Sequence, residues 1–191
     1  MIAVPSAEKY FTLNEIALMS LMGGLVFVMK TALRMPLGIP GHTGIFLVIP
    51  VIIGVAIIRK PGSGTYIGLV SGVLLSFFGI SGMHVFDVFL YTALGASIDA
   101  AGYVFRYRME SVPFGVLAGI AGNLAKMVVN FAVNLAIGVP LVVVAVGAGI
   151  SSISHVLFGA LGGLISAYLV ARLIKTGVIS RDATGADCND S

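Results

Sequence analysis

Six apolar runs, separated by short polar segments, account for most of the 191-residue chain. A helix that crosses the hydrocarbon layer of a membrane needs about 20 mostly apolar residues. The pattern therefore predicts six membrane-spanning helices, at residues 14–33, 43–58, 64–80, 85–105, 113–137 and 150–174. Residues 141–146 are apolar but too few to span, so we interpret them as an outer loop or as the start of the sixth helix. A polar tail, 176–191, follows the last run.

The composition indicates a protein surrounded by lipid. Hydrophobic residues make up 58% of the chain and charged residues 10%, whereas a soluble domain carries about 25% charged residues. We therefore expect one all-α transmembrane domain, residues 1–191, that passes several times through the cell membrane. The single cysteine, Cys188, lies in the tail, which argues against a disulfide framework or a cysteine-based metal site.

The basic residues predict the orientation of the chain. They stand in pairs between the apolar runs and form no basic patch, so we expect no nucleic-acid partner. Cytoplasmic loops carry an excess of Lys and Arg, and the predicted layout puts eight basic residues on one side and two on the other. Both termini are therefore expected in the cytoplasm. The eight are Lys9, Arg59, Lys60, Arg106, Arg108, Arg172, Lys175 and Arg181, and the two are Lys30 and Arg34.

Small residues recur every four positions in several runs. This spacing lets the backbones of neighbouring helices approach closely in a membrane. It fits packing inside one bundle, or docking onto a second membrane protein. The repeats include Gly115/Gly119 and Gly159/Gly163, and the candidates for a partner interface are Ser20, Gly24, Gly64 and Gly68.

Polar side chains at membrane depth are the main functional signal, because each costs roughly 2.5–3.5 kcal/mol to insert when charged. They lie in stripes on one helix face of the last three predicted spans. Together the stripes predict an outward-facing pocket for a small polar molecule, although an isolated Asn more often bonds a neighbouring helix. The candidate substrate-binding residues are His84, Asp87, Tyr91, Lys126, Asn130, Asn134 and His155.

The ammonium group of Lys126 needs an anion. Asp87, Asp99 and an acidic group on a ligand are all open alternatives. Asp99 is also the one carboxylate deep in a predicted span, and buried carboxylates are typical of proton-coupled transport.

The first outer loop contains two prolines and several glycines, yet it is apolar. This composition excludes a regular helix and suits a lid over a pocket mouth, with a static connection as the alternative. The candidate lid residues are Arg34, Gly41 and His42.

The sequence contains no enzyme motif, so we expect no catalytic residue and no cofactor. His42, His84 and His155 could in principle meet as metal ligands, but we predict no metal site.

Two stretches and the overall plan resemble the substrate-binding S components of energy-coupling factor (ECF) transporters. One stretch is IRKPGSGTYIGLVSG, residues 58–72, and the other is ISHVLFGALGGL, residues 153–164. The resemblance implies a six-helix subunit that captures a water-soluble vitamin or vitamin precursor from outside. It also implies partners, namely a transmembrane T component and two ATPase subunits. The junction at residues 59–62 looks most like S components for thiamine or its hydroxymethylpyrimidine precursor.

Two other function classes stay open at this point. One is a self-sufficient ion- or proton-coupled secondary transporter or channel for a small polar solute. The other is a structural membrane protein whose polar stripes only bind neighbouring helices.

Overall fold

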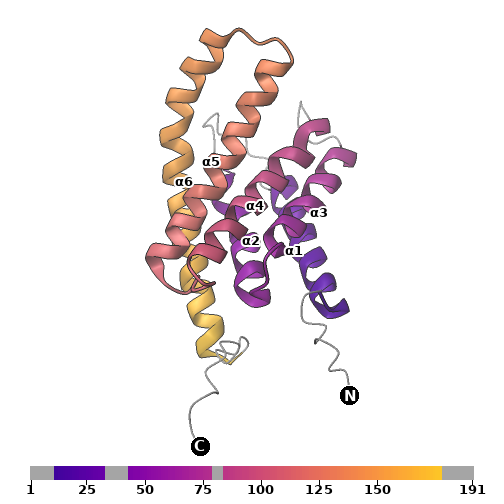
Figure 1. Ribbon diagram of the computed structural model, residues 1–191, viewed down its shortest axis with the longest axis vertical. Helices are drawn as coiled ribbons and strands as arrows, with labels where there is room; N and C mark the ends of the chain where they lie inside the picture. The colour runs from indigo at the N-terminus through magenta and orange to yellow at the C-terminus, as the bar shows by residue number, and fades with distance from the viewer. Residues whose placement is uncertain (1–10, 33–42, 79–83, 178–191) are drawn as a thin grey trace, which may run out of the picture.

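The computed structural model describes residues 11–32, 43–78 and 84–177, and within them every regular element is a helix. Six α-helices form one bundle (Figure 1). They are α1 (Leu13–Ala32), α2 (Gly44–Ile58), α3 (Ser63–Phe78), α4 (Asp87–Val104), α5 (Val112–Ala136) and α6 (Leu141–Lys175), and a 3-10 turn, η1 (His84–Phe86), precedes α4. The all-α class is confirmed.

Four helical stretches are long and apolar enough to cross a membrane. These are Leu13–Ala32, His84–Val104, Val112–Ala136 and Ser151–Lys175. The other two helices, α2 and α3, are apolar but only 15 and 16 residues long, less than the roughly 20 residues that a perpendicular span needs. The length and apolar character of these helices are those of a membrane protein. The count of six crossings stays a prediction.

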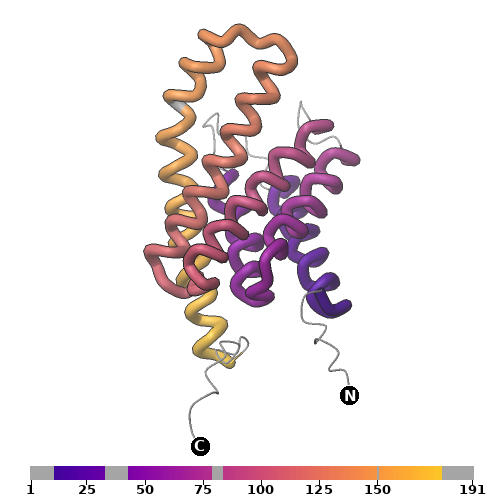
Figure 2. The backbone as a smooth tube through the Cα atoms, viewed as in Figure 1, coloured from indigo at the N-terminus to yellow at the C-terminus, as the bar shows by residue number. Residues whose placement is uncertain are grey.

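The sixth helix begins earlier than the expected residue 150. Residues 141–146 are its first turns and not an outer loop, because α6 starts at Leu141 directly after Pro140. Gly138, in a left-handed conformation (φ 91°), reverses the chain just after α5 ends. The resulting α5–α6 hairpin extends beyond the other four helices (Figure 2). The start of α1 and the end of α6 lie at the opposite end of the bundle.

Helix α2 lies at the centre of the bundle. Ten of its 15 residues are buried, and it packs against all five other α-helices. A helix that is apolar on every side needs such surroundings. Its core side chains include Leu47, Val51, Ile52 and Val55, all at most 1% exposed.

Glycine positions let two helix pairs approach at backbone distance. On α3, a Cβ at Gly64 would lie 2.7 Å from the Gly95 carbonyl oxygen of α4, and one at Gly68 would collide with the Tyr91 carbonyl. On α5, a Cβ at Gly119 would collide with the Gly159 carbonyl of α6. At these glycines the four-residue spacing therefore serves packing between helices of the bundle. Gly64 and Gly68 are buried against α4, and their assignment to a partner interface stays a prediction.

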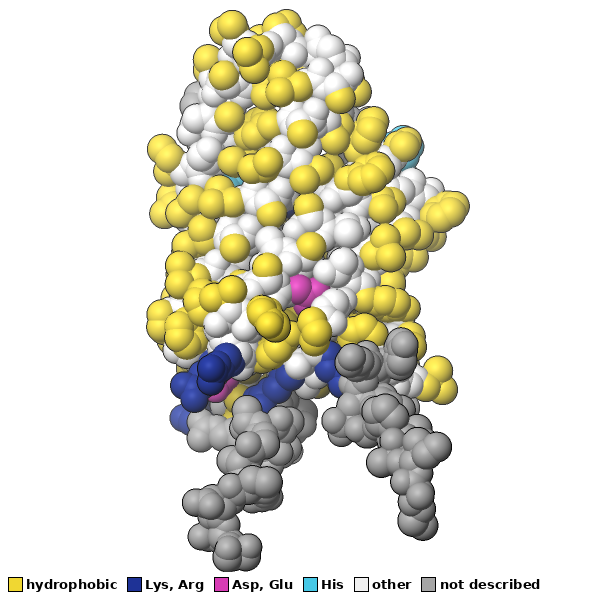
Figure 3. Space-filling model, viewed as in Figure 1, with side chains coloured by type: hydrophobic (Ala, Val, Ile, Leu, Met, Phe, Trp, Pro, Cys, Tyr) yellow, Lys and Arg dark blue, Asp and Glu magenta, His cyan; other side chains and the backbone are white. Residues whose placement is uncertain are grey.

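Basic side chains gather at the end of the bundle where α1 starts and α6 ends (Figure 3). Six of the eight Lys and Arg residues in the described ranges lie in the loops and helix ends there. We call this region the basic end; it comprises Arg59, Lys60, Arg106, Arg108, Arg172 and Lys175. The distribution fits the positive-inside pattern from which the orientation is predicted.

Helix α1 begins at the basic end with a capping box and an ion pair. Thr12 and Glu15 form a capping box, in which the Thr12 N–H donates to the Glu15 carboxylate (2.7 Å) and the Glu15 N–H donates to the Thr12 hydroxyl (3.3 Å). The Glu15 carboxylate also pairs with Lys60 of the α2–α3 loop at 2.9 Å. The start of α1 is therefore tied to the loop between α2 and α3.

Candidate functional site

Tyr91 of α4 lies between two lysines from two other helices. Lys30 of α1 donates to the Tyr91 hydroxyl at 2.9 Å, and its Nζ is 5.4 Å from the ring centroid. The Nζ of Lys126 on α5 lies 4.9 Å from the same centroid. Tyr91 is 0% exposed, while both lysines are half-buried. The Lys126 amino group lies within the range at which the negative face of an aromatic ring attracts an ammonium group, whereas the Lys30 ammonium group bonds the hydroxyl. Tyr91 therefore contacts basic side chains from two other helices.

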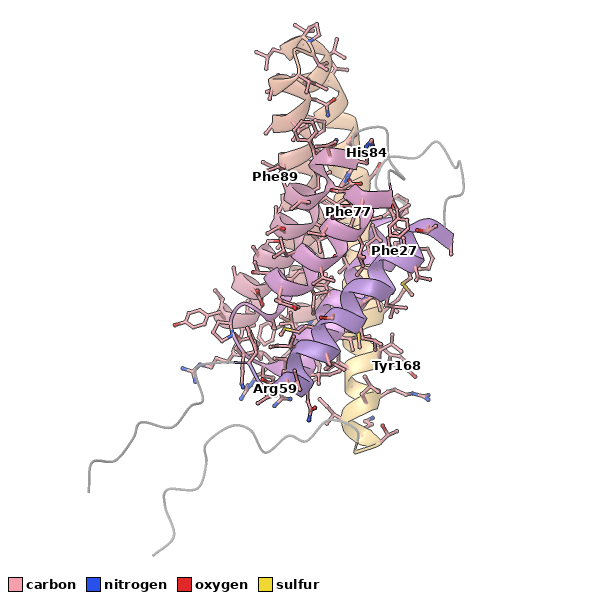
Figure 4. All side chains as sticks on the ribbon, turned by 90° about the vertical axis from the view of Figure 1, so that its right-hand side faces the viewer. Phe27, Arg59, Phe77, His84, Phe89 and Tyr168 are labelled. Carbon is pink, nitrogen blue, oxygen red and sulfur yellow. The ribbon has the colours of Figure 1, made fainter. Side chains whose placement is uncertain are left out.

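Asp87 lies near Tyr91 and Lys126, and His84 precedes it by three residues. Asp87, 3% exposed, is the first residue of α4, one turn before Tyr91 on the same face. A carboxylate at a helix N-terminus is stabilised by the helix dipole. Lys126 interacts electrostatically with both Asp87 and Lys30, attractively with the first and repulsively with the second. Figure 4 shows His84, in η1, toward the end of the bundle opposite Arg59.

The helix lengths place this cluster near one end of the bundle. Lys30 is two residues from the end of α1 and Tyr91 is four residues from the start of α4, or about 3 and 6 Å along the axes. Helix α5 continues ten residues past Lys126, about 15 Å. The hairpin of α5 and α6 therefore rises beside the cluster on the side away from the basic end.

The side-chain amides of Asn123 and Asn134 on α5 bond to helix backbones. Asn123 is 0% exposed and donates from Nδ2 to the His155 carbonyl of α6 at 2.8 Å, while its Oδ1 is buried without a partner. Asn134 donates to the Asn130 carbonyl of its own helix at 2.7 Å. Asn123 thus joins α5 to α6. The nearest described contact of Asn134 is local to α5.

His155 of α6 lies near Lys126. Its Nδ1 is 2.8 Å from the Ser151 carbonyl, one turn earlier on α6. It also interacts electrostatically with Lys126 of α5. The structure therefore brings His155, Lys126, Tyr91 and Asp87 toward one region, and it reveals no described contact that draws in Asn130 or Asn134. The ligand-sized hollow expected between the last three helices stays a prediction.

Asp99 has a role unlike the one considered from the sequence. Its carboxylate accepts from the backbone N–H groups of Gly64 (2.8 Å) and Thr65 (2.6 Å) and from the Thr65 hydroxyl (2.6 Å). It thereby caps the N-terminus of α3 from the neighbouring helix. Asp99 lies two turns from Tyr91 along α4, so its partner is the start of α3 and not Lys126.

Tyr107, in the loop between α4 and α5, lies near this acid. Burial raises the pKa of the Tyr107 phenol above its usual value, and the charge of Asp99 adds to the shift. The phenol therefore stays neutral at physiological pH.

Lys30 is the member of the cluster that sequence reasoning missed. Its place between two apolar runs predicts only a topology signal on the outer side of the membrane. A signal was present, because Met19, Gly23, Val26 and Lys30 recur at helical spacing, and the first three are the buried residues of α1. Lys30 therefore continues the buried face of α1 toward the bundle interior.

The remaining candidates fall into two groups. Arg34, Gly41 and His42, proposed for the lid, lie outside the described residues. On α1, a Cβ at Gly24 would meet nothing within 4 Å, whereas the Ser20 hydroxyl lies 3.4 Å from the Tyr66 hydroxyl of α3. Gly24 therefore has open space beside it, and Ser20 contacts the bundle.

Neither Tyr91 nor Phe89, two aromatic residues of α4, is placed to stack on a ligand ring inside the bundle. Tyr91 is completely buried, so its ring is not open to a ligand in this conformation. Phe89 is 61% exposed, and Figure 4 shows it on the outside of the bundle. Stacking by either residue is therefore not supported.

Two of three comparisons with known proteins give a match. No curated protein matches the chain. A solved structure described as "Crystal structure of an S-component of ECF transporter" is similar, with a TM-score of 0.60, 22% sequence identity and 88% of each chain covered. At this identity the likeness shows a shared fold, which supports the resemblance noted in the sequence but not its thiamine or hydroxymethylpyrimidine type. Residues 14–125, more than half of the chain, match the family described as "ABC-type cobalt transport system, permease component". This chain therefore belongs to that family of transport permease components.

Proposed function

We propose that this chain is the membrane-embedded substrate-binding subunit of an ECF-type importer, and that it captures a water-soluble vitamin or vitamin precursor from outside the cell. The observation that carries the proposal is the cluster around Tyr91. Charged side chains from α1, α4 and α5 converge there at low exposure, and buried ionisable groups in membrane proteins typically mark a substrate path. Shared fold and family membership support the same conclusion.

The proposed site combines the cluster with the elements around it. His84, Asp87, Lys126 and His155 would contact substrate, with Asn130 and Asn134 on the rising part of α5. The loop that contains Arg34, Gly41 and His42 would close over the substrate.

A transmembrane T component and two ATPase subunits would supply the energy, and the chain itself would carry out no catalysis. The open face of α1 around Gly24 is the surface that we propose for the T component, with Ser20 at its edge. Close approach of helices in lipid needs a small residue with free space beside it.

Cobalt, named in the family description, is a less suitable substrate for this cluster. Cobalt ions are bound in proteins by imidazole, thiolate and carboxylate ligands. Among the described residues, no group of three or more His, Cys, Asp or Glu side chains could hold a metal ion. The Lys30 ammonium group also donates to the Tyr91 hydroxyl, and its positive charge would repel a divalent cation.

The test has two parts. The small molecule retained after purification in detergent is identified by native mass spectrometry, and uptake is measured in cells with and without the partner ATPases. We expect a retained vitamin-like molecule, co-purification with ATPase subunits, and loss of uptake when these are deleted. Uptake that continues without them would favour the secondary transporter, and the absence of any retained molecule would favour a structural role.

The site assignment has its own test. Replacing Lys126 or Asn130 by Ala should weaken binding of the retained molecule by at least about 1 kcal/mol if the side chain contacts it. Ser97→Ala is the control, because the Ser97 hydroxyl bonds its own helix at the Leu94 carbonyl. Unchanged affinity in both site variants would contradict the assignment.

A further inference from the structure

A pocket lies at the basic end, where the loop after α4 leads into α5. It has a volume of about 240 Å³ and is lined by Val104, Phe105, Arg106, Arg108 and Phe114. The rings of Phe105 and Phe114 stack, with their centroids 4.7 Å apart and an interplanar angle of 9°. The pocket therefore combines two guanidinium groups with a pair of stacked aromatic rings.

The loop between α4 and α5 is held to the bundle at two residues. Tyr107 is half-buried, its N–H donates to the Gly102 carbonyl at 2.7 Å, and its ring lies 3.1 Å from where a Cβ of Gly102 would stand. Met109 is 0% exposed. Arg106 and Arg108, which alternate with these two residues, are both exposed. The anchored loop thus presents both arginine side chains at its surface.

The backbone of this loop is strained. Arg106 and Tyr107 both have left-handed conformations, with φ of 50° and 57°. Residues other than glycine, asparagine and aspartate rarely adopt this conformation, because the Cβ crowds the backbone. Such outliers persist where surrounding contacts hold them, and they are concentrated at ligand-binding and switch regions. The loop geometry therefore favours a binding role for the pocket.

The two guanidinium groups are available to an anion. Among the residues that the structure describes, neither Arg106 nor Arg108 forms a side-chain ion pair or hydrogen bond. Two nearer acids of the chain are engaged elsewhere, since Glu15 pairs with Lys60 and Asp99 bonds the start of α3. A guanidinium group binds phosphate oxygens through two parallel hydrogen bonds. The pocket therefore has the charge and the donors for a phosphate group.

The location of the pocket favours a lipid as the source of that phosphate. Apolar side chains beside it are open to lipid, because Val104 is 69% exposed and Leu117, one turn after Phe114 on α5, is 49% exposed. The basic end is predicted to face the cytoplasm, where membranes carry anionic lipids and basic pockets between helices bind their headgroups. The volume is below the roughly 300–1,000 Å³ of pockets that enclose a whole small molecule. It suits a headgroup whose acyl chains lie outside.

We propose that this pocket binds the phosphodiester headgroup of an anionic phospholipid in the cytoplasmic leaflet. Arg106 and Arg108 bind the phosphate, and the acyl chains lie along the exposed apolar faces of α4 and α5. The site is separate from the Tyr91 cluster, which lies toward the other end of the bundle. It therefore goes beyond the proposed function and does not depend on which molecule is transported.

The test is native mass spectrometry of the full chain in an uncharged detergent, titrated with dioleoylphosphatidylglycerol or with dioleoylphosphatidylcholine. The acyl chains of the two lipids are identical, but the choline adds a positive charge that the two arginines repel. We expect the first phosphatidylglycerol to bind about tenfold or more tightly than the first phosphatidylcholine. Inorganic phosphate in excess should not displace it, because the acyl chains also contribute to the affinity.

Two double variants that lose the same charge locate the site. Each arginine should contribute about fivefold, which corresponds to about 1 kcal/mol. Arg106→Asn/Arg108→Gln should therefore weaken phosphatidylglycerol binding by about tenfold or more. Arg172→Gln/Lys175→Gln is the matched control at the same end, and it should lose less than about threefold. Arg172 does not line the pocket, and its Nε donates to the Tyr168 hydroxyl of its own helix at 3.2 Å.

The pocket variant is chosen to keep the loop intact. Asparagine adopts the left-handed conformation more readily than arginine, so Arg106→Asn fits the backbone. Circular dichroism and gel filtration establish that each variant is folded. If the double variant is not, Arg108→Gln alone should still weaken binding by about fivefold.

Three results would each overturn the proposal. Equal binding of the two lipids would remove the charge preference, displacement by inorganic phosphate would indicate a site for a free anion, and equal losses in the two double variants would indicate diffuse attraction to the basic end. Unchanged lipid binding in the pocket variant would overturn it as well, and loss of co-purifying protein from that variant would assign the arginines to a protein contact. The proposed function is tested separately, by the retained molecule and by uptake.

Discussion

The carboxylate of Asp99 is expected to be a structural cap of α3, and its removal should destabilise the bundle. In Asp99→Ala, the N–H groups of Gly64 and Thr65 lose the acceptor that they bond at 2.8 and 2.6 Å. Leaving a buried donor without a partner costs about 1–3 kcal/mol. The loss of two donors therefore predicts a destabilisation of about 2–6 kcal/mol. The Thr65 hydroxyl can rotate toward another acceptor and is not counted.

Thermal unfolding in detergent, followed by circular dichroism, measures this effect. For a chain of this size, each 1 kcal/mol lowers Tm by about 2–4 °C, so we expect a decrease of at least about 4 °C. Asp99→Asn should fall between wild type and Asp99→Ala, because its amide oxygen still accepts. Ser97→Ala, on the same helix, should stay within about 0.5 kcal/mol of wild type.

The same variants address the proton-coupled alternative. If Asp99 only caps α3, the uptake that remains in Asp99→Asn should follow the amount of folded protein. An Asp99→Ala protein that unfolds at the wild-type temperature would refute the capping argument. Loss of uptake in a fully stable Asp99→Asn variant would instead favour a proton-carrying role.

Four further substitutions test the packing and capping of the helices, each by its Tm in detergent. Gly119→Ala should lower Tm, because the added Cβ collides with the backbone of α6. Gly24→Ala adds a Cβ in open space, so Tm should stay unchanged or rise through a helix-propensity gain of up to about 1 kcal/mol. A lower Tm for Gly24→Ala than for Gly119→Ala would contradict the packing. Thr12→Ala should cost about 1 kcal/mol through loss of the α1 cap, and no change in Tm would mean that the capping box is not formed. Asn123→Ala removes the hydrogen bond to the His155 carbonyl and should cost about 1–3 kcal/mol, so a value near zero would show that water replaces the amide.

The sequence alone determined the all-α class, the membrane environment and the approximate extent of each helix. These properties depend on runs of apolar residues and on the turn residues between them, which are local along the chain. The start of α6 at Leu141 was harder to place, because an apolar run of six residues fits either a loop or the first turns of a helix. Its assignment needed the reversal at Gly138 and the hairpin that follows.

The tertiary structure alone decided which polar groups meet. Lys126 and Asp99 are both polar residues within apolar runs, yet one faces Tyr91 and Lys30 while the other caps α3. The periodicity of a helix fixes which residues share a face, but not the neighbouring helix toward which that face is turned. That rotation is set by packing between helices, above all at the glycine contacts where α3 meets α4 and α5 meets α6. For the same reason, Lys30 reaches the Tyr91 hydroxyl, and Gly64 and Gly68 lie against α4.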